Sequence, residues 1–464
     1  MFLTQYYLDC LSQASYMIAD ERTGRAVVVD PRRDVSEYLA DARAHGFSVV
    51  GVINTHFHAD FVAGHLEMAD RTGAWIGYGR RAETEYPIRK LADGERISLG
   101  DVTLEIMETP GHTPESISVV VYERVEDTVP YGVLTGDALF IGDVGRPDLL
   151  ASVGVTAEEL GAMLHDSVQN KLMGLPDEVR VFPAHGAGSA CGKNLSTNKQ
   201  STIGEQRATN YACVPMGREE FVALVAAGQP AAPGYFAYDA ELNRKDRVRY
   251  DSAAPLPLTR ERFTELRAAG AVVVDARTPQ EFAAGHLRGA VNVPADGRFA
   301  EQAGTVLDPS DELLVMAPQN REEEVVTRLA RIGFDRVAGY LRNPEDALED
   351  LSAEVLPASR LAAAELRDAL TAENPPVVVD VRTCGEREAA GFIDGALHIP
   401  LSELPRRTEE LPADRPLVLH CAGGHRSSIA ASVLRHRGFT DVSDVLGGYA
   451  AWALSAQAAT PATF

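Results

Sequence analysis

Short apolar runs alternate with polar, helix-like stretches along the first half of the chain. The β-branched runs SYMIAD (15–20), AVVVD (26–30) and VVGVINT (49–55) each end in polar residues, which predicts strands. Between them, VSEYLADARAHG (35–46) has helical spacing and closes on a glycine, so it predicts a helix. RISLGDVTLEIMETP (96–110) predicts two strands around a Gly-Asp turn. This alternation indicates an α/β domain.

The second half of the chain contains an internal repeat. VVVDARTPQEFAAGHLRGAVNVP (272–294) and VVVDVRTCGEREAAGFIDGALHIP (377–400) share one pattern, and Asp275 and Asp380 within them are 105 residues apart (380 − 275). Each copy alternates strands with helices, which predicts a parallel sheet covered on both faces. The proline-rich stretch RYDSAAPLPLTRERF (249–263) predicts a linker before the repeat.

Composition and charge limit the partners and the compartment. With 464 residues the chain is expected to form two to four domains, and its net charge of −23 opposes binding to nucleic acid or an anionic membrane surface. No apolar run is long enough to span a bilayer, and the N-terminus meets Asp9 and Cys10 too early for a signal peptide. Five thinly spread cysteines fit free thiols in a reducing compartment. We therefore predict a cytoplasmic protein.

Histidines and carboxylates of the first half follow apolar runs, at positions where loops are expected. Side chains at the ends of strands converge at one edge of a sheet, so these residues predict a single metal centre rather than separate surface or core histidines. They are His56, His58, Asp60, His112, Asp137 and His185.

The motifs that carry these residues resemble the metallo-β-lactamase superfamily, an αββα sandwich that includes glyoxalase II. THFHAD (55–60), TPGHTPES (109–116), TGD (135–137) and PAHG (183–186) occur in the family's order, and the resemblance covers about the first 250 residues. In two-metal members, the histidine that follows the position of Asp60 is a ligand of the second metal. This chain has Phe61 there.

A phenylalanine cannot coordinate a metal, so the resemblance implies that the second metal site lacks a ligand. Only the other metal site is then complete. His56, His112 and Asp137 then form the two-histidine, one-carboxylate set typical of non-haem Fe(II) oxygenases, with one iron per chain. The residues predicted to orient ligands or manage protons around that site are His58, Asp60 and His185.

FIGDVGRPDL (140–149) resembles the Gly-Arg-x-Asp segment of persulfide dioxygenases. The matching residues are Gly145, Arg146 and Asp148. The resemblance implies that Arg146 is catalytic and holds an anionic persulfide through charge-assisted hydrogen bonds. The alternative is an Arg-Asp pair that only fixes the loop.

In the second copy of the repeat, Cys421 follows an apolar strand and begins a loop that opens a helix. This loop would surround the sulfur with backbone N–H groups beside Arg426, which stabilises a thiolate nucleophile or a persulfide. The loop and its flanks, residues 358–455, resemble a rhodanese sulfurtransferase, whereas phosphatases of this shape need a longer loop. The residues predicted to hold the persulfide, besides Cys421 and Arg426, are Ala422, Gly423, Gly424 and His425.

The first copy has Met316 where the second has Cys421, although Arg321 matches Arg426. Glu322, Glu323 and Glu324 follow this loop, and their charge would repel an anionic sulfur substrate. We therefore predict that this copy is a rhodanese fold without transferase activity, serving as a spacer or docking surface.

The remaining cysteines are less informative. Cys191 follows His185 closely, and Lys193 is near enough in sequence to lower the pKa of its thiol, so Cys191 is a candidate for binding or relaying a persulfide. A structural role for Cys191 is equally open. Three other cysteines are predicted to be packing residues: Cys10, Cys213 and Cys384.

The whole chain resembles the bacterial persulfide dioxygenase–sulfurtransferase fusions. The predicted domains are a dioxygenase domain at 1–250, an inactive rhodanese domain at 258–357 and an active rhodanese domain at 358–464. The resemblance implies oxidation of a low-molecular-weight persulfide by O₂ to sulfite and thiol, followed by sulfur transfer onto sulfite to give thiosulfate, in the oxidation and detoxification of sulfide. It also implies a homo-oligomer. The identity of the thiol stays open.

Two other functions are consistent with parts of the sequence. One is a thioester hydrolase like glyoxalase II with accessory rhodanese domains, against which Phe61 and Arg146 argue. The other is a non-catalytic persulfide carrier or sensor with a structural metal, against which the complete facial triad argues.

Overall fold

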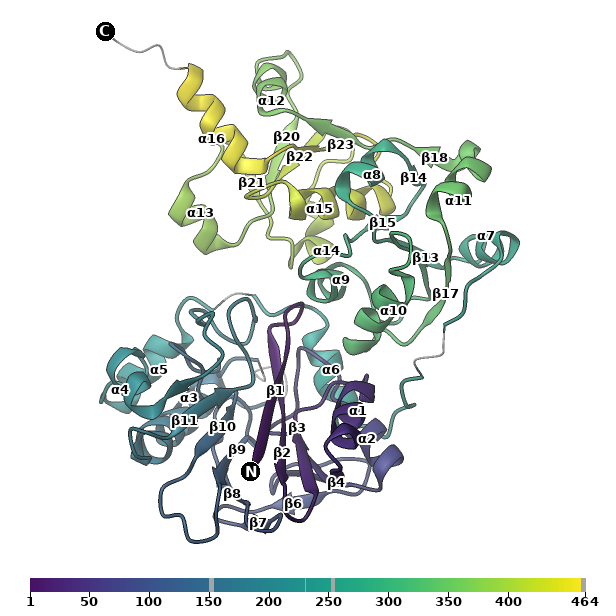
Figure 1. The fold of residues 1–464 in the computed structure, drawn as a ribbon. Coiled ribbons are helices and arrows are strands. Elements are labelled where there is room, and N and C mark those ends of the chain that lie inside the picture. The colour runs from purple at the N-terminus through teal and green to yellow at the C-terminus, as the bar shows by residue number, and fades with distance from the viewer. Residues whose placement is uncertain (150–153, 230, 252–254, 460–464) are drawn as a thin grey trace. The chain divides into compact units, whose positions relative to one another are not determined.

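The computed structural model describes residues 1–149, 154–229, 231–251 and 255–459, which form two compact units. The first unit consists of Met1–Asp251 and Ala330–Gly333, and the second comprises the rest of the described chain. The finer division into three domains stays a prediction, because the second unit contains both copies of the repeat (Figure 1).

The first unit is built on two six-stranded sheets whose strands follow one another in chain order. The first sheet contains β1 (Phe2–Leu8), β2 (Gln13–Asp20), β3 (Arg25–Val29), β4 (Ser48–Ile53), β5 (Trp75–Gly79) and β6 (Arg89–Leu91). The second contains β7 (Arg96–Ser98), β8 (Thr103–Glu108), β9 (Ile117–Tyr122), β10 (Gly132–Gly136), β11 (Arg180–Pro183) and β12 (Ser201–Thr202). The strands predicted in the first 110 residues are therefore confirmed.

Alternation along the strands explains why the sheets stack. On β3, Val27 and Val29 enter the core between the two sheets, whereas Val28 packs on the opposite face against Tyr38 of a covering helix. On β10, Val133 belongs to an apolar cluster that also contains Phe221 of a helix on the outer face of the second sheet. The result is an αββα sandwich, as predicted.

Helices cover both outer faces of the sandwich, and three of them follow β12. The helix predicted at 35–46 is α1, and it ends before Gly46, whose φ of +73° suits glycine. The helices of the unit are α1 (Ser36–Ala44), α2 (His65–Thr72), α3 (Ala157–His165), α4 (Ile203–Thr209), α5 (Arg218–Ala226) and α6 (Phe236–Leu242).

The second unit contains two parallel sheets, one from each copy of the repeat, which confirms the predicted fold. In the first copy the strand order is β15-β13-β16-β17, and in the second it is β19-β23-β22-β20-β21. The strands of these sheets are β13 (Val272–Asp275), β15 (Val291–Asn292), β16 (Leu313–Met316), β17 (Val337–Leu341), β19 (Ser359–Leu361), β20 (Val377–Asp380), β21 (Leu397–His398), β22 (Leu417–His420) and β23 (Val442–Val445). A small antiparallel pair joins β14 (His286–Leu287) to β18 (Val355–Leu356).

The helices of the second unit follow the same repeat. They are α7 (Arg260–Ala268), α8 (Pro279–Ala284), α9 (Phe299–Val306), α10 (Glu322–Arg331), α11 (Pro344–Asp350), α12 (Ala363–Leu370), α13 (Cys384–Ala390), α14 (Leu404–Arg407), α15 (His425–His436) and α16 (Gly448–Ala459). Both α8 and α13 begin with a capping box, in which Thr278 and Thr383 exchange hydrogen bonds with Glu281 and Glu386.

Two predictions about this region are wrong in part. The linker predicted at 249–263 ends earlier, because α7 begins at Arg260 after the N-cap Thr259 and buries Phe263 in the core. Residues 252–254 of that stretch lie outside the described part of the chain. Cys384 is exposed and is not a packing residue, whereas Cys10 and Cys213 are buried as predicted. All five cysteines are free thiols.

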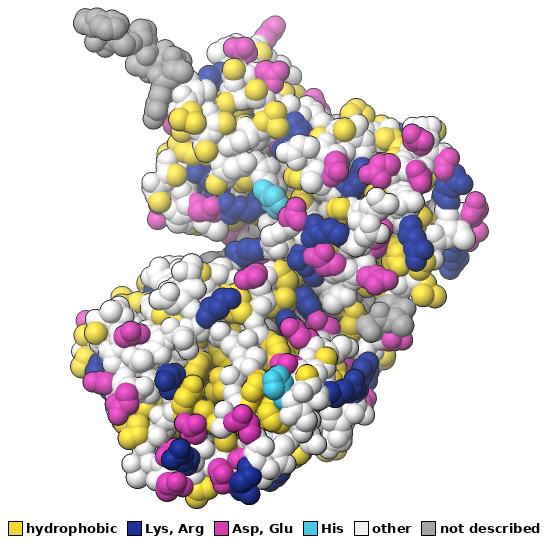
Figure 2. Space-filling model, viewed as in Figure 1, with side chains coloured by type: hydrophobic (Ala, Val, Ile, Leu, Met, Phe, Trp, Pro, Cys, Tyr) yellow, Lys and Arg dark blue, Asp and Glu magenta, His cyan; other side chains and the backbone are white. Residues whose placement is uncertain are grey.

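Acidic and basic side chains are interspersed over the face of the molecule shown in Figure 2. Within the described residues, no helix combines the length and apolar character needed to cross a membrane.

Candidate functional site

The predicted metal ligands of the first unit come together because the strands that precede them end at the same edges of the two sheets. His56 follows β4, and Asp137 directly follows β10. β11 runs parallel to β10, so His185 after β11 emerges beside Asp137. All three side chains are buried, as is His112 in the loop between β8 and β9.

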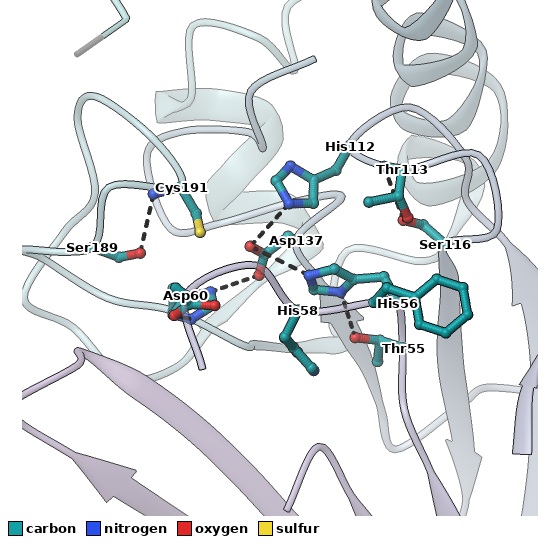
Figure 3. Close-up of polar contacts among 12 residues, drawn as sticks. Thr55, His56, His58, Asp60, His112, Thr113, Ser116, Asp137, Ser189 and Cys191 are labelled. Carbon is teal, nitrogen blue, oxygen red and sulfur yellow. Dashed lines mark hydrogen bonds and ion pairs between the residues drawn. The ribbon is translucent and has the colours of Figure 1, made fainter. Parts of the chain in front are cut away.

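His56, His112 and Asp137 form a compact three-ligand group. The Nε2 atoms of His56 and His112 lie 3.8 and 3.5 Å from Oδ2 of Asp137, and the three atoms face one another in Figure 3. One ligand atom from each residue lies within 4.8 Å of the other two. Among the described residues, neither Nε2 of His56 nor Oδ2 of Asp137 has a hydrogen-bond partner.

A hydrogen-bond chain fixes the tautomer of His56. The Thr55 hydroxyl donates to Oδ2 of Asp30 at 2.9 Å, so it accepts from Nδ1–H of His56, also at 2.9 Å. Nε2 of His56 is then unprotonated and directed at Asp137, as a metal ligand must be. Sequence reasoning missed Asp30 and Thr55, although Asp30 ends the run AVVVD and could have been recognised as a carboxylate at a strand end.

His112 is oriented in the same way by a backbone carbonyl. Its Nδ1 lies 3.0 Å from the carbonyl oxygen of Arg146, which can only accept, so Nε2 again carries the lone pair. Burial lowers the pKa of His112, and burial followed by the neighbouring His58 lowers the pKa of His56 well below its ordinary value. Both imidazoles are therefore neutral.

His185 lies between two carboxylates. Its Nδ1 is 2.7 Å from Oδ1 of Asp137, and its Nε2 is 2.7 Å from Oδ2 of Asp60. Burial opposes its protonation, but Asp137 and Asp60 outweigh burial and raise the pKa of His185 well above its ordinary value. The ring is an imidazolium, which neutralises charge beside the three-ligand group.

Cys191 approaches the same side of the site, near His185 as its place in the sequence suggests, and its approach to Asp60 was not predicted. Asp60, His185 and Cys191 form a second group whose ligand atoms lie within 4.8 Å of one another, and Figure 3 shows the Cys191 sulfur directed toward Asp137. Burial, then Asp60 and Asp137, raise the pKa of the Cys191 thiol well above its ordinary value. The prediction that Lys193 lowers it is wrong, because the Lys193 ammonium donates to backbone carbonyls of residues 224 and 227.

His58 and Phe61 form the wall of the site. Nε2 of His58 lies 2.9 Å from Oδ1 of Asp30, and its Nδ1 has no partner among the described residues. The Phe61 ring is fully buried against the His58 ring, with 4.3 Å between their centroids. An apolar side chain therefore occupies the corner where the resemblance places a second-metal ligand.

The Gly-Arg-x-Asp segment supports the site through its backbone. A Cβ atom on Gly145 would lie 2.0 Å from the carbonyl oxygen of Asp137, so only glycine allows this approach. The Arg146 guanidinium makes a two-pronged ion pair with Asp148, with both N···O distances 2.7 Å, and donates to the Ala190 carbonyl. Its predicted role in holding a persulfide stays a prediction.

These groups fit a divalent transition metal. The two neutral imidazole nitrogens and the carboxylate oxygen converge, and two of these atoms have no hydrogen-bond partner within the described chain. Burial raises the pKa of Asp137, but the neighbouring His185 outweighs burial and keeps it well below its usual range. Asp137 is therefore ionised. Two imidazoles with one carboxylate form the donor set that suits Fe(II).

The second unit carries the predicted cysteine loop. Cys421 follows β22 and is 1% exposed, and the backbone N–H of Gly424 donates to its sulfur at 3.1 Å. Gly424 has a φ of +91°, which allows the loop to turn into α15. The Ser427 hydroxyl lies 3.7 Å from the same sulfur. A backbone donor and a hydroxyl therefore surround the thiol at a helix N-terminus.

The two copies direct the loop arginine differently. In the second copy, Arg426 forms an ion pair with Glu386, and this hydrogen bond is the main cause that lowers the pKa of Glu386 to about 2. In the first copy, Arg321 is paired with Asp296 and Glu324. Glu386 is a partner that sequence reasoning missed.

The first copy also reaches the active loop of the second. Gln302 on α9 lies 3.5 Å from Nδ1 of His425 through its amide nitrogen. The backbone N–H of Asn292 donates to the Ser432 hydroxyl of α15 at 2.9 Å. The first copy therefore forms part of the surroundings of the Cys421 loop, whereas its predicted lack of transferase activity stays a prediction.

Comparisons with known proteins define the class of the chain. Residues 8–185 match the metallo-beta-lactamase superfamily, and residues 259–342 and 362–455 match the rhodanese-like domain. The crystal structure of a metallo-beta-lactamase from Staphylococcus aureus is 32% identical with a TM-score of 0.66, covering 74% of this chain and 98% of that chain. The chain therefore belongs to the metallo-beta-lactamase superfamily, with two rhodanese-like domains after the sandwich.

Curated relatives of the first half have different names. The human protein named persulfide dioxygenase ETHE1, mitochondrial, is 27% identical over 227 residues, covering 48% of this chain and 80% of the relative. The hydroxyacylglutathione hydrolase of Rhodospirillum rubrum is 28% identical over 240 residues, covering 51% of this chain and 83% of the relative. The chain spans 54% of the length of a beta-lactamase hydrolase-like protein from Agrobacterium fabrum.

Proposed function

We propose that the chain is a non-haem Fe(II) dioxygenase that oxidises low-molecular-weight persulfides, coupled to a sulfurtransferase that forms thiosulfate. The observation that carries the proposal is the convergence of two neutral imidazole nitrogens with one carboxylate oxygen, in a chain that also holds a rhodanese loop. The human relative named persulfide dioxygenase supports the choice of substrate.

The net oxidation is RSSH + O₂ + H₂O → RSH + H₂SO₃, in which the outer sulfur is oxidised and O₂ is reduced. Fe(II) held by His56, His112 and Asp137 would supply open positions for small ligands and electrons for O₂ chemistry. The chain's own residues hold the ligand tautomers, exclude bulk water by burial and keep a proton on His185 beside Asp137.

The sulfurtransferase step uses Cys421 as the sulfur carrier. The Cys421 thiolate attacks the outer sulfur of a second persulfide, the S–S bond of that persulfide breaks, and RSH leaves with a proton. Sulfite then attacks the outer sulfur of the cysteine persulfide, giving thiosulfate and regenerating the thiol. The Gly424 N–H and the Ser427 hydroxyl stabilise the negative sulfur in both steps.

Substitution of Cys421 separates the two activities. Iron-loaded Cys421→Ser should consume O₂ with glutathione persulfide at the wild-type rate and release sulfite where the wild type releases thiosulfate. An oxygen electrode and ion chromatography measure both, and Cys384→Ser is the matched control because Cys384 is also in this domain. Loss of O₂ uptake in Cys421→Ser would contradict the division of labour.

A thioester hydrolase is the second candidate, favoured by the hydroxyacylglutathione hydrolase relative and by the group of Asp60, His185 and Cys191. If that group held a second cation, metal analysis would find about two metals per chain, as in two-metal hydrolases. We expect about one iron per chain and no cleavage of S-lactoylglutathione. Two zinc ions with thioester cleavage would establish the hydrolase instead.

A further inference from the structure

The inactive rhodanese copy has a cavity over the loop that replaced the cysteine. Its volume is about 410 Å³, and it lies where β16 leads into α10 and β17 leads into α11. Small-molecule binding sites have volumes of about 300 Å³ or more, so this cavity can hold a ligand the size of a few amino-acid residues. Met316 at the end of β16 is fully buried and cannot act as a nucleophile.

A mostly buried glutamate lines this cavity without a partner. Glu322 is the first residue of α10, lines the cavity and is 8% exposed. Within the described chain its carboxylate has no hydrogen bond or ion pair, whereas Glu324 two residues later pairs with Arg321 and Arg328. The carboxylate therefore offers free acceptor positions to the cavity, so Glu322 is suited to a cationic group of a ligand.

An arginine of opposite charge lines the same cavity. Arg342 follows β17, is exposed, and forms no ion pair with Glu322 or with another carboxylate among the described residues. The exposed Glu323 also lines the cavity, so two carboxylates and one guanidinium surround it. Charges of both signs that line one cavity without pairing can be satisfied together by a ligand with an ammonium and a carboxylate group. A simple cation would leave Arg342 unused, and a simple anion would leave Glu322 unused.

Most of the remaining lining consists of amide side chains. Asn320 and Asn343 have left-handed backbones, with φ values of +66° and +51°, a conformation that asparagine tolerates better than most residues. The Gln319 amide donates to the side-chain oxygen of Asn343 at 3.4 Å and so joins the two loops. Tyr340 is 4% exposed and contributes an aromatic wall. These groups can hydrogen-bond the polar backbone of a short peptide.

We propose that the inactive rhodanese copy is a binding site for an α-amino carboxylate, the zwitterionic end of an amino acid or short peptide. Glu322 binds the ammonium group, Arg342 binds the carboxylate, and the amides of Gln319 and Asn320 orient the remainder. The proposal goes beyond the proposed function, since binding here needs neither the metal group nor Cys421. The loss of the nucleophile thus changed a transfer site into a recognition site.

Isothermal titration of the full-length protein with S-methylglutathione tests the proposal. This tripeptide has one α-amino-carboxylate end and no thiol, so it cannot react at Cys421. We expect saturable binding that falls about tenfold or more in Glu322→Gln and in Arg342→Gln, because each substitution removes a charge-assisted interaction. The matched controls are Glu312→Gln and Arg288→Gln, which change exposed residues of the same copy outside the cavity lining. Both controls should bind the tripeptide like the wild type.

Blocking the ligand's ammonium gives a second readout. N-acetyl-S-methylglutathione should bind at least about tenfold more weakly to the wild type, and Glu322→Gln should lose this discrimination. Saturation by calcium chloride alone, without binding of the tripeptide, would replace the proposal with a cation site. Absence of tripeptide binding, or equal affinity in the wild type and both cavity variants, would overturn it. Because Arg342 is exposed, Arg342→Gln keeps the test decisive if Glu322→Gln does not fold.

Discussion

Thr55→Val should weaken metal binding without removing any metal ligand. The Thr55 hydroxyl links Nδ1 of His56 to Asp30 through two hydrogen bonds of 2.9 Å. Valine has nearly the same shape but cannot accept the imidazole N–H. The backbone N–H of Thr55 still donates to Asp30 at 2.7 Å, so the loop itself should stay in place.

The size of the effect follows from burial and from tautomer control. Thr55 is 1% exposed and His56 is fully buried, so no water can replace the lost hydroxyl. His56 would then have an unpartnered N–H or would change to the tautomer whose Nε2 cannot bind a metal. Removing such an orienting partner costs about 10- to 100-fold in metal affinity, or about 1.4–2.7 kcal/mol.

Metal-free wild type, Thr55→Val and Thr55→Ser would be titrated with Co(II) in competition with a fluorescent chelator. Thr55→Ser keeps the hydroxyl and should bind like the wild type. Thermal melting of the metal-free proteins would separate a loss of affinity from a loss of folding. If Thr55→Val bound Co(II) as tightly as the wild type while His112→Ala did not bind it, the link from Asp30 to His56 would not orient the ligand.

Two further substitutions test the loop beside the metal ligands and a buried ion pair of the first unit. Gly145→Ala should abolish metal binding in the same titration, because the new methyl group would lie 2.0 Å from the carbonyl oxygen of Asp137. The control is Gly217→Ala, whose methyl group would meet no atom within 4 Å, and it should bind metal normally. Burial raises the pKa of Glu67, but Arg247 outweighs burial and lowers it from 4.5 to about 2, which contributes about 3 kcal/mol of stability. Because the folded pKa is depressed, that stability is present above pH 4.5 and lost as the pH falls toward 2. Glu67→Gln should therefore melt lower at pH 7 and lose less on acidification to pH 3; an unchanged melting profile would show that the pair contributes little.

Regular elements could be predicted because they depend on local patterns. The run AVVVD alternates between two buried faces of one sheet, and its β-branched residues favour a strand in any context. Repetition of one pattern after 105 residues predicted two copies of one parallel sheet, and both are present. The predicted linker extends too far along the chain, because a helix begins after the N-cap Thr259. That helix buries Phe263, and this burial depends on tertiary packing that the local pattern does not show.

The ligand group could be predicted only as a set of residues, because sequence spacing does not determine which side chains contact one another in the fold. His56, His112 and Asp137 meet as predicted, but at the edges of two sheets and not of one, because His56 follows β4 and Asp137 follows β10. The approach of Cys191 to Asp60 was not predictable, since 131 residues (191 − 60) separate them and only the folded loops bring them together. Nearness in sequence was misleading for Lys193, whose long side chain reaches carbonyl groups elsewhere.

The two rhodanese copies show how the same local structure can support different chemistry. Both copies keep the strand, the Asp-Arg pair after it and the capping box of the next helix. In the second copy, the capping glutamate Glu386 also holds Arg426 beside the cysteine loop. In the first copy, Asp296 and Glu324 hold Arg321 instead, so restoring a cysteine at Met316 would not by itself restore the charge arrangement around the sulfur. The predicted lack of transferase activity in this copy therefore rests on the ion pairs as well as on the missing nucleophile.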